Sequence, residues 1–171
     1  MERRHLKGDA ESVAVYSDCE AYRFRLERVW GPGGRVLFVM LNPSTATEVQ
    51  NDPTVERCER RARALGFGAF AVANIFAYRA TDPRVMRGVA DPVGPGNDAA
   101  IVDLAGAADM VVCAWGTHGA HLGRGAAVEA LLRRQGRDLF HLGLTLAGAP
   151  KHPLYIGYAA PPVPWVRPPA G

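Results

Sequence analysis

The feature that most constrains the fold is an unbroken apolar run from Val36 to Leu41, rich in β-branched and aromatic side chains. Glycines precede this run and Pro43 follows it, which is typical of a strand buried on both faces. Such strands belong to parallel sheets that are covered by helices. Because proline donates no N–H to a sheet and forces the residue before it into an extended conformation, the strand is expected to end at Asn42.

Three further apolar runs follow, and a predicted helix separates each from the next. The four expected strands are residues 35–41, 69–75, 109–115 and 138–144. The three expected helices are residues 52–65, 95–107 and 123–135. Asp52 as N-cap and Pro53 at the first helical position begin the first of these helices. The alternation predicts an α/β three-layer sandwich with a central four-stranded parallel sheet.

The N-terminal part of the chain has a different pattern. Residues 22–30 alternate apolar and charged side chains, which predicts an antiparallel hairpin over residues 13–30 with Arg23 on its solvent face. Residues 1–12 are polar and are expected to be frayed, and the Pro-rich tail 159–171 is expected to be extended. The whole chain 1–171 is expected to form one domain, with a core at 35–158.

Composition indicates a globular protein. The chain has 171 residues, of which 48% are hydrophobic and 22% charged, and no apolar stretch approaches the length of a membrane span. Its first residues lack the apolar segment of a secretory signal, and its three cysteines form no disulfide or metal-binding pattern, so a cytoplasmic location is expected. A net charge of +3 permits a phosphate-bearing partner without requiring one, and a compositional bias explains the many arginines equally well.

Polar residues follow the predicted strands where each one ends. These segments are Asn42-Pro43, residues 74–79 and His152-Pro153. Because parallel strands point the same way, their carboxyl ends are expected to meet at one edge and to form a ligand crevice there. Ordinary turns also use these residue types, so an Asn-Pro turn without a ligand remains an alternative.

Motifs for common cofactors are missing from the sequence. It contains no GxGxxG dinucleotide loop, no GxxxxGK[ST] phosphate loop and no GxSxG serine. The glycine-rich segment 116–125 suits either a phosphate-binding turn or a flexible one. His118 and His121 are candidate metal ligands, but no carboxylate or cysteine joins them at ligand spacing, so neither a metal nor a cofactor is expected.

Taken in order, the strand ends resemble the uracil-DNA glycosylase superfamily. The segment from Met40 to Pro43 is similar to its G-x-N-P motif, with Met40 where that family has glycine. Residues 74–83 look like a shortened form of its N-V-x-x-x-R-P-x-x-R-D-P loop, and residues 152–155 match its H-P-A-Y motif. The chain looks closer still to an uncharacterised bacterial and phage family that bears LNPST, DPT and HPLY. Those motifs stand here at residues 41–45, 52–54 and 152–155.

The resemblance implies a DNA glycosylase of the uracil or mismatch type. Such an enzyme hydrolyses the N-glycosidic bond of a base flipped out of DNA during repair. Asn42 would orient the attacking water and His152 would donate to the leaving base, so these are the expected catalytic residues. The expected substrate-binding residues are Pro43, Ser44, Asn74, Phe76 and Tyr78. The expected DNA-binding residues are Arg79, Lys151, Leu154 and Tyr155, the last two or Ile156 serving as a wedge in the base stack.

Other functions and simpler roles remain open at this point. An N-glycosidase of small nucleosides or nucleotides, or an inactive module that binds nucleic acid or a base, explains the same pattern. His152 also suits a turn residue that caps its loop, and Phe76 and Tyr78 also suit plain core positions. DNA, in single- or double-stranded form, is the expected partner of what is expected to be a monomer with no membrane association. Because an asparagine cannot take a proton from water, a slow enzyme is expected.

Overall fold

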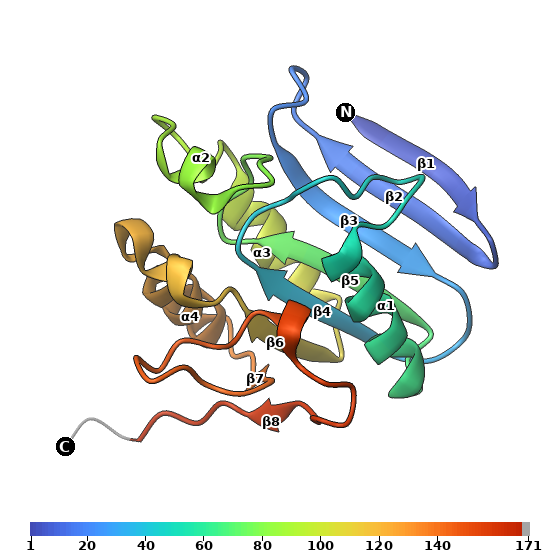
Figure 1. The fold of residues 1–171 in the computed structure, drawn as a ribbon. Helices are drawn as coiled ribbons and strands as arrows, with labels where there is room; N and C mark the ends of the chain where they lie inside the picture. Colours follow the sequence, from blue (N-terminus) through green and yellow to red (C-terminus); the bar gives the residue numbers. More distant parts are fainter. Residues whose placement is uncertain (169–171) are drawn as a thin grey trace.

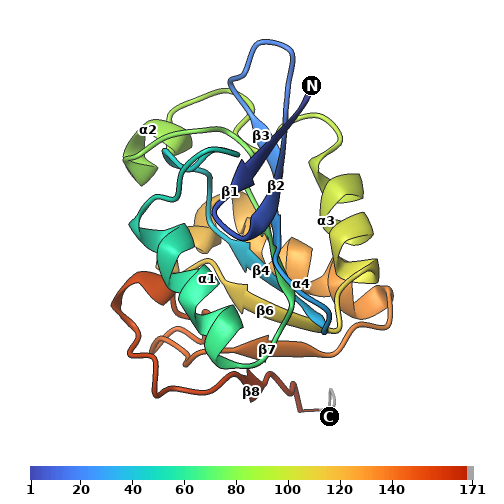
Figure 2. The same cartoon turned by 90° about the vertical axis from the view of Figure 1, so that its right-hand side faces the viewer.

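The computed structural model describes residues 1–168, in which an eight-stranded sheet carries helices on both faces (Figures 1 and 2). The strands are β1 Glu2–Lys7, β2 Ala10–Tyr16, β3 Arg23–Val29, β4 Arg35–Met40, β5 Ala69–Asn74, β6 Met110–Ala114, β7 Leu139–His141 and β8 Val163–Pro164. The α-helices are α1 Pro53–Ala64, α2 Pro83–Arg87, α3 Asn97–Gly106 and α4 Arg124–Arg134, and the 3₁₀ segments are η1 Thr117–Gly123 and η2 Pro153–Tyr155. The α/β class predicted from the sequence is confirmed.

The sheet is larger than predicted and mixed in direction. Its strand order is β1-β2-β3-β5-β4-β6-β7-β8. The β4–β5, β4–β6 and β6–β7 pairs are parallel, whereas the β1–β2, β2–β3, β3–β5 and β7–β8 pairs are antiparallel. The predicted four-stranded parallel sheet is therefore wrong for the sheet as a whole. The predicted N-terminal hairpin is present as the antiparallel pair β2 and β3, and β3 joins it to the sheet by pairing with β5.

The N-terminal segment holds two further corrections. Residues 2–7 form β1, an edge strand, where fraying was expected; its charged and exposed side chains carry no alternating pattern but suit an edge. The β2–β3 pairing shifts register between Val15 and Tyr16, which breaks the alternation that the sequence suggests. Arg23, beyond this shift, lies buried where a solvent-facing position was expected. Arg28 is also buried, on the same face of β3 as Leu26.

Two apolar layers flank the sheet. Helix α1 packs on one face, where Val55, Cys58 and Ala62 join the side chains of Val36 and Phe38. Helices α3 and α4 pack on the other face, through Ile101, Leu104, Val128 and Leu132. The chain leaves β4 through α1 to β5 on one side, and later returns through α3 to β6 on the other (Figure 2). The carboxyl end of β4 is therefore a topological switch point, where α/β proteins bind ligands.

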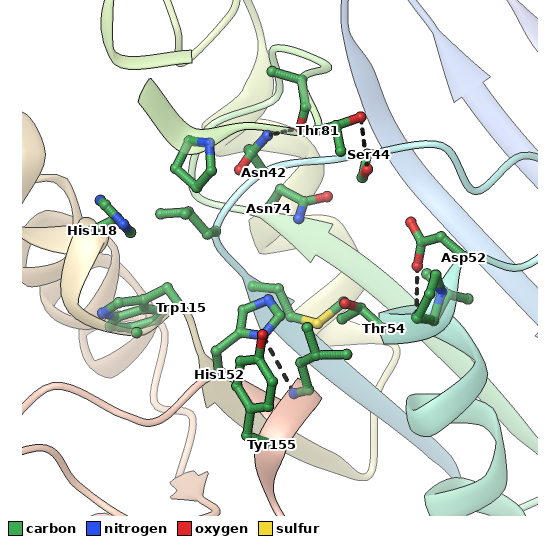
Figure 3. Close-up of a pocket in the computed structure, with 18 of the residues that line it drawn as sticks. Asn42, Ser44, Asp52, Thr54, Asn74, Thr81, Trp115, His118, His152 and Tyr155 are labelled. Atoms are coloured by element: carbon green, nitrogen blue, oxygen red, sulfur yellow. Dashed lines mark hydrogen bonds between the residues drawn. The ribbon is translucent and has the colours of Figure 1, made fainter. Parts of the chain in front are cut away.

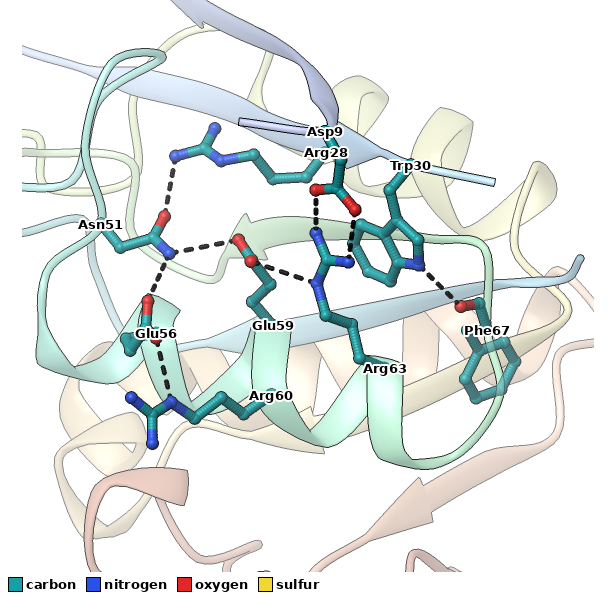
Figure 4. Close-up of polar contacts among 9 residues, drawn as sticks. All are labelled: Asp9, Arg28, Trp30, Asn51, Glu56, Glu59, Arg60, Arg63 and Phe67. Atoms are coloured by element: carbon teal, nitrogen blue, oxygen red, sulfur yellow. Dashed lines mark hydrogen bonds and ion pairs between the residues drawn. The ribbon is translucent and has the colours of Figure 1, made fainter. Parts of the chain in front are cut away.

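Arginines of α1 hold other segments of the chain in place. Arg63 bonds to Asp9 through both of its terminal nitrogens and stacks over Trp30 at 4.1 Å. Asn51, at the start of the helix, accepts from Arg28 and donates to Glu56 and Glu59 (Figure 4). This network ties the loop before α1 to strand β3. It thereby fixes the backbone that leads into the helix.

The C-terminal segment returns to the sheet. Strand β8 pairs antiparallel to β7, and Trp165 directly after it is buried against Trp115, with ring centroids 5.8 Å apart. The tail is extended as predicted up to Pro168, and residues 169–171 of that prediction lie outside the described residues. Among residues 1–168, no helix has the length and apolar character needed to cross a membrane.

Candidate functional site

A pocket of about 560 Å³ opens at the carboxyl ends of β4, β5 and β6, beside the first turn of α1 (Figure 3). Six of the predicted site residues line it. They are Asn42, Ser44, Asn74, His152, Leu154 and Tyr155. The strand ends bring together residues that are up to 113 positions apart in the sequence, from 42 to 155. The pocket volume is in the range typical of small-molecule and cofactor sites.

Five predicted site residues are not among those that line the pocket. Pro43 is buried beneath Asn42, and its carbonyl accepts from the Ala80 N–H at 2.9 Å. Phe76 is fully buried in the core on the α3 side, and its ring stacks against His121. Tyr78 packs edge-on against Tyr22. Pro43, Phe76 and Tyr78 come soon after the buried strands β4 and β5, so packing in the core determines the direction of their side chains.

The two predicted phosphate-binding cations also lie outside the pocket lining. Arg79 donates to the Glu20 carbonyl at 3.1 Å and lies over the Tyr16 ring at 5.0 Å. Lys151 is exposed, and its backbone N–H donates to the Gly143 carbonyl at 2.9 Å. Of the two, Lys151 alone keeps its charged group free of a described contact.

Asn42 presents an acceptor to the pocket. Its Nδ2 donates to the Ala80 carbonyl at 2.8 Å and to the Pro43 carbonyl at 3.1 Å. Both amide hydrogens are therefore used by backbone carbonyls, and Oδ1 remains to accept from a ligand or water. The same two hydrogen bonds fix the orientation of the Asn42 side chain at the carboxyl end of β4.

Asn74 lies deeper in the pocket and presents a donor. It is 2% exposed, its Oδ1 accepts from Arg23 Nη2 at 3.5 Å, and its backbone carbonyl accepts from Asn97 Nδ2 at 2.8 Å. Because Oδ1 faces Arg23, Nδ2 is the group left for a ligand. The last residue of β5 and the first of β3 meet here because the two strands are antiparallel.

His152 caps the short helix η2 and faces the pocket. Its Nδ1 accepts from the Leu154 N–H at 3.3 Å, which places the proton of the neutral ring on Nε2. Burial lowers the pKa of His152 below its ordinary value of 6.5, while the charge of Asp52 acts in the opposite direction. The imidazole is therefore a neutral donor at pH 7, with Nε2 directed into the pocket (Figure 3).

The lowered pKa of His152 makes stability depend on pH. Below pH 6.5 the histidine of the unfolded chain takes up its proton before the folded one does, so protonation favours unfolding as the pH falls. We expect wild type to lose more free energy of unfolding between pH 7.5 and 5.5 than His152→Asn, measured by urea denaturation. Equal losses in the two proteins would contradict a buried, neutral His152.

Sequence reasoning missed two charged groups of the pocket. Arg23 was placed on a solvent face but is 2% exposed; its Nη1 donates to the Ala46 carbonyl at 2.8 Å and its Nε has no partner. Burial lowers the pKa of Arg23 to about 10, so it stays charged at neutral pH. Asp52 was correctly identified as an N-cap, but its place in the pocket was not foreseen. The Asp-Pro-Thr motif that begins at Asp52 was the sequence signal that could have identified it as a pocket residue.

The candidate metal ligands do not form a cluster. His118 lines the rim of the pocket, whereas His121 stacks on Phe76. Within residues 1–168, no group of three His, Cys, Asp or Glu side chains is arranged to hold a metal ion. Burial raises the pKa of the Cys58 and Cys113 thiols, so both are unreactive core side chains.

Fold and pocket together define an α/β protein with a pocket at the switch point of its sheet, where polar side chains lie among a mainly apolar lining. Residues 23–154 match the family described as "Protein of unknown function (DUF1643)", and the chain belongs to this family. Neither the curated proteins nor the solved structures contain a match to this chain.

Proposed function

We propose that this protein is an N-glycosidase that releases a base from DNA, of the uracil or mismatch type. The observation that carries the proposal is that three separate motifs line one pocket. The LNPST motif contributes Asn42 and Ser44, and the DPT motif contributes Asp52. The HPLY motif contributes His152, Leu154 and Tyr155. The resemblance of the strand ends to the uracil-DNA glycosylase superfamily supports the same reaction.

The polar groups of the pocket suit this chemistry. Scission of an N-glycosidic bond leaves an anionic base, and a neutral His152 with its proton on Nε2 is a donor that can stabilise that anion. Asn74 Nδ2 is a donor for a carbonyl oxygen of the base, and Asn42 Oδ1 is an acceptor that can orient the attacking water. No metal or cofactor enters the proposed reaction.

The rim of the pocket offers a wedge for base flipping. Tyr155 is 87% exposed and lines the opening together with Leu154. An aromatic or aliphatic side chain in that place can fill the gap that a flipped base leaves in the stack. Lys151, close by in the sequence, is free to contact a phosphate.

A nucleoside or nucleotide N-glycosidase is the second candidate. The observation in its favour is that arginines near the pocket are bound to other parts of the protein and not free to hold a DNA backbone. Arg79 contacts Glu20 and Tyr16, and Arg57 donates to the carbonyls of Pro153 and Ile156. A pocket that holds the buried cation Arg23, and has few free cations on the described surface around it, suits a small substrate.

One assay separates the candidates. Purified protein is incubated with single- and double-stranded oligonucleotides that carry uracil or a mismatch, and alkali-labile cleavage is scored; deoxyuridine and its 5′-monophosphate are treated in parallel. We expect abasic sites in the oligonucleotides. Base release from the small substrates alone would favour the second candidate. Salt-dependent DNA binding without any base release would indicate a binding module and contradict both.

A further inference from the structure

Asp52 supplies the pocket with a carboxylate for which the proposed reaction has so far no role. It is 7% exposed and is the one acidic side chain among the residues that line the pocket in the described part of the chain. Figure 3 shows it on the α1 side of the pocket, across from Trp115. It comes from the DPT motif, the second of the three motifs that meet here.

The carboxylate is held by the backbone in one orientation. Oδ1 accepts from the Val55 N–H at 2.9 Å, and Oδ2 accepts from the Ala46 N–H at 3.2 Å. A carboxylate has about four acceptor positions, so each oxygen keeps one for a further donor such as water. The contacts of Asn51 with Arg28, Glu56 and Glu59 fix the residue before it. Asp52 is therefore pre-organised.

Three of the other polar groups of the pocket cannot take a proton from water. Asn42 is an amide, which orients water but is not a base. His152 uses Nδ1 to accept from Leu154 and carries its proton on Nε2. Arg23 is a cation. A hydrolase needs a proton acceptor for its attacking water, which leaves Asp52 and His118. His118 is exposed at the rim, whereas Asp52 is buried and held in one orientation by two backbone N–H groups, so Asp52 is the better placed of the two.

We propose that Asp52 is the general base of this site, an inference that rests on the proposed N-glycosidase function. The oxygen of a water held by Asn42 and Asp52 forms a bond to C1′ of the sugar while the C1′–N bond breaks. The electron pair of that bond leaves with the base, whose anion accepts a hydrogen bond from His152. One proton of the water passes to Asp52. The negative charge of Asp52 also stabilises the positive charge that develops on the sugar.

A structural role for Asp52 makes a different prediction, and Asp52→Asn separates the two. Asparagine caps helices about as well as aspartate, so the side-chain oxygen of the variant can still accept from the Val55 N–H. Its amide nitrogen cannot accept from the Ala46 N–H, so the variant loses that bond together with the charge and the basic oxygen. Asp82 is a matched control, because it also precedes a proline, caps α2 and accepts from a helical N–H at 2.9 Å, but does not line the pocket.

Single-turnover base release, melting temperature and the pH dependence of the rate are measured on wild type, Asp52→Asn and Asp82→Asn. We expect Asp52→Asn to release base at least about 100-fold more slowly per folded molecule, a loss beyond what its lower melting temperature explains, and Asp82→Asn to match wild type. The pH dependence of the rate should change in Asp52→Asn and stay that of wild type in Asp82→Asn. The ionisable groups whose pKa values respond to the charge of Asp52 are Arg23, Arg28, Cys58 and His152.

The outcomes separate this inference from the function on which it rests. An Asp52→Asn variant that is as active as wild type, or that loses activity only in proportion to its folded fraction, contradicts Asp52 as the base and leaves the N-glycosidase proposal in place. A wild-type protein that releases no base from any of the substrates contradicts the proposed function and the role of Asp52 with it.

Discussion

Replacement of His152 by alanine is expected to lower single-turnover base release about 100-fold while DNA affinity stays nearly constant. The donor at Nε2 acts on a charge that develops only in the transition state, so its loss affects the rate more than binding. Affinity for DNA depends mainly on phosphate contacts, which this change leaves intact. The rate and the affinity are measured on the same preparation by rapid quench and by fluorescence anisotropy.

Two further variants separate catalysis from the capping role of His152. His152→Asn keeps an oxygen that can accept from the Leu154 N–H but loses the Nε2 donor, so it should be nearly as slow as His152→Ala with a better-preserved melting temperature. His141 has the same local geometry, since its Nδ1 accepts from the Gly143 N–H at 2.9 Å, but it lies outside the pocket. His141→Ala should therefore keep full base release. A His152→Ala protein with lower stability and unchanged specific activity would remove His152 from the catalytic residues.

Replacement of Trp165 by alanine is expected to lower the free energy of unfolding by about 3–5 kcal/mol. The side chain is 4% exposed, packs against Trp115, and lies beneath the guanidinium groups of Arg133 and Arg167 at 5.5 and 4.7 Å from its ring centroid. A loss of this size is a large fraction of the stability of an ordinary domain. Urea denaturation of the full chain measures it.

The neighbouring Val166 provides the control for Trp165. It is 76% exposed, so Val166→Ala should change the free energy of unfolding by less than about 0.5 kcal/mol. Because Trp115 lines the pocket, Trp165→Ala should also weaken ligand binding in the fraction that stays folded. A Trp165→Ala protein as stable as Val166→Ala would show that the C-terminal segment does not contribute to the core.

The parts of the fold that the sequence predicts are those that depend on local apolar patterns. The runs that became β4, β5, β6 and β7 are recognisable because each is short, apolar and followed by a polar turn. Strand β1 has no such signal, because its side chains are exposed and charged and its pairing with β2 is decided by the backbone. The buried position of Arg23 accompanies a register shift, which residue alternation does not reveal.

Part of the pocket could be predicted from the sequence, because some of its residues directly follow the apolar runs that identify the strands. Asn42, Asn74 and His152 were expected together because each follows a strand that points to one edge. Phe76 and Tyr78 were expected there as well, but side-chain direction after a strand ends depends on packing against distant residues. Asp52 reaches the pocket from the N-terminus of α1. The residue pattern that identifies it as an N-cap does not indicate which residues its side chain faces.

The central claim is that this pocket hydrolyses an N-glycosidic bond. The most direct measurement is single-turnover treatment of a uracil-containing oligonucleotide in water enriched in ¹⁸O, with mass spectrometry of both products. We expect free uracil and one ¹⁸O atom at C1′ of the abasic sugar. An intact oligonucleotide, or released base without ¹⁸O at C1′, would contradict it.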